Sequence, residues 1–146
     1  MDLAAREGEI MPTLSIITIR IALLHLLMGW TVGAVLLIHK SGVRTFDMYL
    51  ALREAHFHLL FFGWTVQLCL GVAFWILPKF VGDDVPFYGT KRLAESSILA
   101  LNLGILGAIG SNTVAWTLYT ASALLFVGHI WPRVKPFSGA KKSESL

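Results

Sequence analysis

Three long apolar runs restrict what this chain can fold into. Residues 13–39 contain one formally charged side chain, residues 55–78 contain none, and residues 93–132 contain one. A transmembrane helix needs roughly 20 mainly apolar residues, so each run is long enough to cross a bilayer. The sequence therefore predicts an integral membrane protein whose first partner is the lipid bilayer.

The composition supports this class and excludes others. Charged residues make up 14% of the chain, against about 25% in soluble domains. The 146 residues allow one domain, 1–146. The one cysteine, Cys69, excludes a disulfide framework, a cysteine zinc site and covalent haem attachment through a C-x-x-C-H motif. The net charge of +3 is modest, and we assign it to membrane topology, not to nucleic-acid binding.

The third apolar run is too long for a single membrane helix. A break at Gly110–Thr113, "GSNT", divides it in two, because glycine, serine and asparagine favour turns. The sequence thus predicts an all-α protein with four transmembrane helices in an up-down bundle, followed by a basic polar tail at 133–146. The predicted spans are 13–39, 55–78, 93–110 and 113–132.

The lysines and arginines near the predicted span ends indicate the orientation, since cytoplasmic loops carry an excess of them. One side of the membrane would hold eight of these residues and the other side three. Both termini are therefore expected in the cytoplasm. The membrane is expected to be the inner (plasma) membrane of a prokaryote. The eight are Arg6, Lys79, Lys91, Arg92, Arg133, Lys135, Lys141 and Lys142, and the three are Lys40, Arg44 and Arg53.

Two histidines at the start of the second run are the strongest functional signal. His56 and His58 lie in "REAHFHLLFFGW", and ionisable residues within membrane spans are functional candidates by default. Two residues are about 200° apart on a helix, so the two imidazoles point to opposite sides and cannot bind one iron together. Neutral imidazole is a usual axial ligand of haem iron. The spacing therefore favours two sites, one on each side of the helix.

Several neighbours of this pair have two readings. Gly63 and Gly71 share the face of His56, where they leave room for a flat macrocycle or for close packing of another helix. Arg53 is placed to bind a cofactor carboxylate, or else to extend to the membrane interface or contact Glu54. His25, in the first run, is either a further ligand or a hydrogen-bond donor to a neighbouring carbonyl. All are candidate cofactor-binding residues.

The segment "AHFHLLFFGWTVQLCLGVAFWILPKF" resembles the histidine-bearing helices of the haem-copper oxidase and nitric oxide reductase catalytic subunit, and "IRIALLHLLMGWTVGAVLL" resembles that family's first helix. The resemblance implies a low-spin haem. His56 matches the axial ligand of the family's second helix and the first histidine of its tenth-helix motif. His58 matches the second histidine of that motif, and the two histidines of the motif bind different haems.

The family subunit has three arcs of four helices, whereas this chain has one arc. It also lacks the histidine pair and the histidine–tyrosine pattern of the family's copper site, so we do not expect a stand-alone oxygen or nitric oxide reductase. A cyclic trimer would rebuild the three arcs and place His56 of one chain opposite His58 of the next, with a haem between them. A twofold dimer is the alternative.

The sequence thus predicts a homo-oligomeric haem b protein with bis-histidine haem at its subunit interfaces and a role in transmembrane electron transfer. Its redox partner would be a quinone or a redox protein. Two alternatives stay open at this stage. One is an iron with a single ligand that senses a diatomic gas. The other is a cofactor-free structural or assembly subunit of a respiratory complex.

Overall fold

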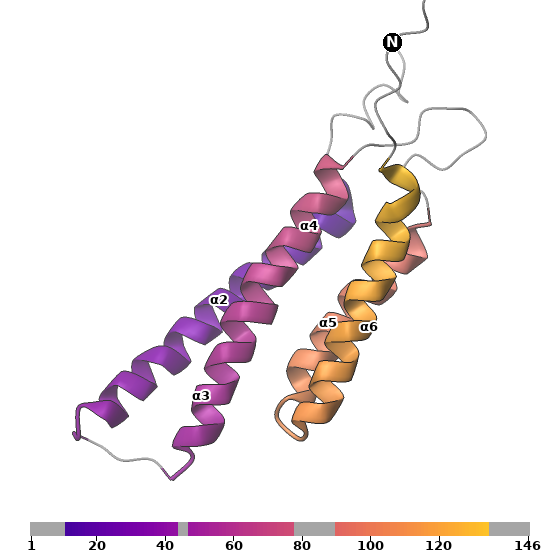
Figure 1. The fold of residues 1–146 in the computed structure, drawn as a ribbon. Coiled ribbons are helices and arrows are strands. Elements are labelled where there is room, and N and C mark those ends of the chain that lie inside the picture. The colour runs from indigo at the N-terminus through magenta and orange to yellow at the C-terminus, as the bar shows by residue number, and fades with distance from the viewer. Residues whose placement is uncertain (1–10, 44–46, 78–89, 135–146) are drawn as a thin grey trace, which may run out of the picture.

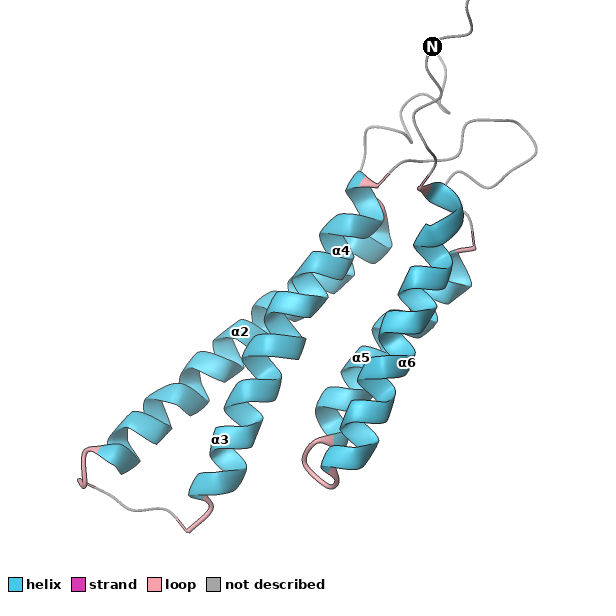
Figure 2. Cartoon of the chain, viewed as in Figure 1, coloured by secondary structure: helices cyan, strands magenta, loops and turns pink. Residues whose placement is uncertain are grey.

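The computed structural model describes residues 11–43, 47–77 and 90–134, and within these ranges the chain folds into four helices (Figures 1 and 2). The first is α2 (Thr13–Lys40), the third is α5 (Lys91–Gly107) and the fourth is α6 (Asn112–Ile130), which ends in a short 3₁₀ turn, η2 (Trp131–Arg133). The second helix is continuous over Tyr49–Ile76 and is called the α3–α4 helix below. Its parts are α3 (Tyr49–Phe57), the π-helical η1 (His58–Val66) and α4 (Gln67–Ile76).

Over the residues that the structure describes, the predicted all-α architecture with four helices is confirmed. The α3–α4 helix begins at Tyr49, ahead of the predicted start at residue 55. The third apolar run breaks where the "GSNT" motif indicated, between Gly107 and Asn112. Three helices are long and apolar enough to cross a membrane: α2, the α3–α4 helix and α6 with its 3₁₀ turn. The fourth, α5, is shorter, at 17 residues. The predicted tail lies outside the described residues from 135 onward.

Consecutive helices run in opposite directions and form two pairs (Figure 1). α2 lies along the α3–α4 helix, and α5 lies along α6. The pairs meet in an apolar core that contains Phe62 of η1, Leu101 and Ile105 of α5, and Tyr119 of α6. The α3–α4 helix is therefore the central element, because it packs against α2 on one side and against the α5–α6 pair on the other.

The distribution of side chains suits a lipid environment. Large apolar side chains point outward, including Leu27 at 65% exposure and Leu124 at 68%. Polar side chains are turned inward: Gln67, Ser97 and Ser122 are buried. The Ser97 hydroxyl donates to the Ser122 carbonyl oxygen at 2.8 Å, so one of these buried groups bonds within the bundle. This inversion of the soluble pattern is expected where lipid replaces water as the solvent.

The η1 segment widens the α3–α4 helix at its centre. The amide of Gln67 donates to the carbonyl of Phe62, five residues earlier, as in a π-helix. π-Helical segments are rare in proteins, and those that occur are often found at functional sites. The sequence "HLLMGWTV" of α2 recurs here as "HLLFFGWTV", with one extra residue inside η1. The wider turn therefore accommodates the additional residue without breaking the helix.

Arg133 joins the end of α6 to the end of the α3–α4 helix. Its side chain is 2% exposed, and its guanidinium donates to the Leu77 carbonyl at 2.8 Å and to the Phe74 carbonyl at 3.4 Å. It also donates to Nε2 of His129 at 3.0 Å. The last carbonyls of a helix have no partner within it, so a cation from outside satisfies them well.

We predict that Arg133→Ala destabilises the protein by about 1.5–3 kcal/mol, the usual cost of losing hydrogen bonds to a charged group. Unfolding of the detergent-solubilised protein by heat or denaturant would measure this change. The control is Arg92→Ala, which truncates an exposed arginine of α5. Equal stability of the two variants would show that Arg133 does not stabilise the end of the α3–α4 helix through these carbonyls.

Candidate functional site

Two histidines hold α2 and the α3–α4 helix together through glycine carbonyls. Nδ1 of His56 lies 2.8 Å from the carbonyl oxygen of Gly29, and Nδ1 of His25 lies 3.2 Å from that of Gly63. A carbonyl oxygen only accepts, so the proton of each neutral imidazole is on Nδ1. The lone pair is then on Nε2. This tautomer, with its proton on Nδ1, is the one that binds a metal through Nε2.

Glycine makes room for both imidazole rings. A Cβ added at Gly33 would lie 2.7 Å from Cε1 of His56, and one added at Gly63 would lie 2.8 Å from Cγ of His25. Gly71 packs against α2, and its carbonyl accepts a hydrogen bond from Ser15 Oγ at 2.7 Å. Of the two readings of Gly63 and Gly71, the structure shows close packing of a neighbouring helix.

His58 faces away from α2. Its side chain is buried, with 4% exposure, and its Nδ1 lies 2.9 Å from the hydroxyl oxygen of Tyr119 on α6. His56 and His58 therefore contact different helices, and both make their hydrogen bonds within one chain. Either partner in the bond between His58 and Tyr119 can be the donor, so this contact alone does not fix the tautomer of His58.

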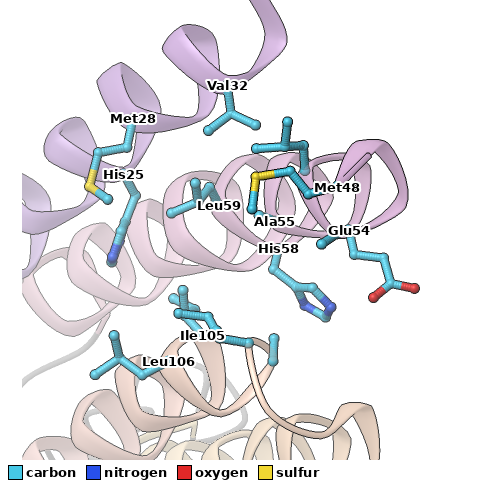
Figure 3. Close-up of a pocket in the computed structure, with 14 residues that line it drawn as sticks. His25, Met28, Val32, Met48, Glu54, Ala55, His58, Leu59, Ile105 and Leu106 are labelled. Carbon is cyan, nitrogen blue, oxygen red and sulfur yellow. The ribbon is translucent and has the colours of Figure 1, made fainter. Parts of the chain in front are cut away.

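A cavity of about 400 Å³ lies between α2, the α3–α4 helix and α5, and both His25 and His58 line it. Figure 3 shows the two imidazoles projecting from their helices toward the α5–α6 pair. The remaining wall is mostly apolar and includes Met28, Leu59 and Ile105. The volume is near the lower end of the 300–1,000 Å³ that is typical of small-molecule sites.

A second hollow of about 350 Å³ also borders His58. It is lined by Arg53, Glu54, Phe57, His58, Asn112 and Trp116, so His58 and Glu54 border both spaces. Nδ2 of Asn112 donates to the Glu54 carboxylate at 3.5 Å, which joins α6 to α3 at this point. Arg53 is exposed here. The hollow thus brings the predicted carboxylate-binding arginine close to His58.

The sequence reading did not identify Tyr119, Gly29 or Gly33. A signal for Tyr119 was present, because the buried residues of α6 recur at helical spacing. They are Ala115, Tyr119, Ser122, Phe126 and His129. A tyrosine on the inner face of a membrane helix needs a hydrogen-bond partner, and a histidine is a suitable one. Gly29 and Gly33 could be recognised only once the partner of His56 was known.

Within the described ranges, no three side chains of histidine, cysteine, aspartate or glutamate gather as a metal site. A free zinc or iron ion usually needs three or four protein ligands, whereas a haem iron needs only one or two from the protein. The arrangement of two histidines around an apolar cavity is thus compatible with the second kind of centre and does not favour the first.

Comparisons with models of protein families, with curated proteins and with solved structures found no match. The resemblance to haem-copper oxidase helices therefore stays a prediction that depends on the residues around His56 and His58.

We predict that Gly33→Ala destabilises the protein by about 1–3 kcal/mol, because the new methyl group overlaps the ring of His56. The control is Gly128→Ala on α6, where an added Cβ meets nothing within 4 Å and the helix propensity improves. Unfolding of both variants in detergent would test this. Gly33→Ala as stable as Gly128→Ala would show that His56 does not pack on α2.

Proposed function

We propose that this protein is an integral membrane protein that binds haem b and transfers electrons within the membrane. One observation carries the proposal. His25 and His58, from two different helices, line the same apolar cavity. Nδ1 of each is engaged in a hydrogen bond, and Nε2 of neither has a hydrogen-bond partner in the part of the chain that the structure describes.

The residues present suit this cofactor. His25 and His58 are the candidate axial ligands, and the apolar wall would exclude water and lower the local dielectric constant. Arg53, at the hollow beside His58, is the candidate partner of the cofactor's carboxylates. When bound, haem supplies one-electron redox chemistry whose potential depends on the axial ligands and on burial.

Coordination by two histidines favours electron transfer over catalysis. Two imidazole ligands would fill both axial positions of the iron, so no position would remain for a substrate or a gas. A single histidine would leave one position free, as a diatomic-gas sensor requires. Since two histidines line the cavity, we favour the closed form with an electron donor such as a quinone or a redox protein.

The cofactor can also be placed between chains. His56 is half-buried, and its Nε2 has no described hydrogen-bond partner, so it could bind a haem shared with a neighbouring copy in a trimer or a dimer. That arrangement needs Nε2 of His58 to reach the neighbouring chain, whereas the His58 side chain is buried inside its own chain, with 4% exposure. The geometry therefore favours the site within one chain, formed by His25 and His58.

A second candidate is a structural or assembly subunit without a cofactor. The bonds of His25 and His56 to glycine carbonyls favour it, because they already join α2 to the α3–α4 helix. In this case the histidines act only as interhelical hydrogen-bond donors, a role that polar side chains often have in membrane bundles.

We predict that the protein, purified in detergent after expression with ample haem, shows sharp reduced absorption bands that carbon monoxide does not shift. His58→Ala should lose most of the haem. His25→Ala should leave one axial position open, so that carbon monoxide now shifts the bands. His39→Ala is the matched control, since His39 does not line the cavity, and its spectrum should equal that of the unsubstituted protein.

Each other result assigns a different function. A colourless protein would support the cofactor-free subunit. Carbon monoxide shifts in the unsubstituted protein would support a sensor with an open site. Loss of haem in His56→Ala, together with unchanged haem content and an unchanged spectrum in His25→Ala, would place the cofactor between chains.

We further propose that all four helices cross the membrane, with both termini in the cytoplasm of a prokaryote. α5 has 17 residues, the lower limit for a transmembrane helix, and would span about 26 Å at 1.5 Å per residue. The excess of lysine and arginine on one side supports the orientation.

This topology is testable with reporter fusions in a bacterium. Alkaline phosphatase, which is active only outside the cytoplasm, should be active when fused after Gly42 and inactive when fused after Leu146. A cytoplasmic fluorescent protein should give the opposite pattern. Activity of the phosphatase at Leu146 would mean that α5 does not cross the membrane or that the orientation is reversed.

A further inference from the structure

The hydroxyl of Tyr119 is held beside His58 in the interior of the bundle. The tyrosine is 6% exposed, and its oxygen lies 2.9 Å from Nδ1 of the histidine. This is the only hydrogen bond that the described residues offer the phenol. A buried phenol without this contact would carry an unsatisfied polar group in the membrane core.

The ring of Tyr119 cannot easily move away from His58. Phe62 stacks on one of its faces, with ring centroids 3.7 Å apart and planes at 10°. Gly104 of α5 also lies against the ring, so close that an added Cβ would be 2.6 Å from Cε1. Trp116 meets it edge-on at 5.9 Å. The position of the phenol oxygen is thus set by three neighbouring residues.

Either partner can be the donor in the hydrogen bond between Tyr119 and His58. If the phenol donates, Nδ1 of His58 accepts and its neutral ring carries the proton on Nε2, where it blocks coordination through that atom. If His58 donates from Nδ1, the phenol oxygen accepts and the lone pair is on Nε2. Coordination through Nε2 therefore requires the second arrangement, which has the same tautomer as His25 and His56.

We propose that Tyr119 is a positioning residue for His58: its phenol oxygen accepts a hydrogen bond from Nδ1–H, fixes the direction of the imidazole and strengthens it as an axial ligand through Nε2. This inference rests on the proposed haem site and adds the group that tunes it. A hydrogen bond accepted from a ligating imidazole raises the basicity of the ligand. A more basic ligand stabilises oxidised iron more than reduced iron, so Tyr119 lowers the reduction potential.

The test compares the haem-loaded protein with Tyr119→Phe, which keeps the stacked ring and removes only the oxygen. We expect haem affinity to fall about 10- to 100-fold, the usual effect of losing such a partner. In the haem that remains, the midpoint potential should rise, and the electron paramagnetic resonance spectrum of the oxidised form should change. The potential and the resonance spectrum report on the ligand itself, which a purely structural role would leave unaltered.

Two further variants keep the test decisive. Tyr49→Phe is the matched control, because Tyr49 stacks on His39 and does not line the cavity, so its potential should equal that of the unsubstituted protein. Gly104→Ala keeps the hydroxyl of Tyr119 but displaces its ring, and it should change the potential in the same direction as Tyr119→Phe. Gly104→Ala serves alone if Tyr119→Phe does not fold.

The outcomes separate this inference from the proposed function. A colourless unsubstituted protein overturns both. A haem-binding protein whose potential, affinity and resonance spectrum are the same in Tyr119→Phe and Tyr49→Phe overturns only the role of Tyr119. Haem that persists in His58→Ala also overturns that role, because the tyrosine would then act on a residue that is not a ligand.

Discussion

The close approach of α2 to the α3–α4 helix is the contact on which the rest of the structure depends. Glycine at positions 29, 33, 63 and 71 removes side chains on both helices, so that imidazole nitrogens reach backbone carbonyls across the contact. Without a hydrophobic driving force between helices in lipid, such packing and hydrogen bonding are the main sources of stability. The same bonds place the proton of His25 and His56 on Nδ1 and so decide which nitrogen can bind a ligand.

This contact also orients the α3–α4 helix toward the α5–α6 pair. With one side packed on α2, the opposite side presents His58 and Phe62 to Tyr119. The cavity lies beside this second contact, and its two histidines come from the two helices of the first pair. A candidate site and a structural contact thus share residues, so a substitution at His25 should affect both stability and binding.

Much of the fold could be predicted from the sequence because apolar length and turn residues are local signals. The four helices and the break near Gly110 follow from them directly. The partners of the histidines could not be predicted, since they depend on how α2 and α6 are rotated about their axes. Spacing showed that His56 and His58 face apart, but only the packed helices reveal that one meets Gly29 and the other Tyr119. The π-helical turn at His58–Val66 was also outside the reach of a reading that assumed 3.6 residues per turn.

The buried Arg133 has a consequence for how the chain assembles in the bilayer. Its guanidinium can donate to the carbonyl oxygens of Phe74 and Leu77 only when the α3–α4 helix already lies beside α6. A long arginine side chain at a helix end favours keeping its charge in the headgroup region until that contact forms. The pair formed by α2 and the α3–α4 helix therefore has to be in place before the α5–α6 pair can dock fully. Docking brings the positive charge of Arg133 inward and closes the bundle at the end of α6.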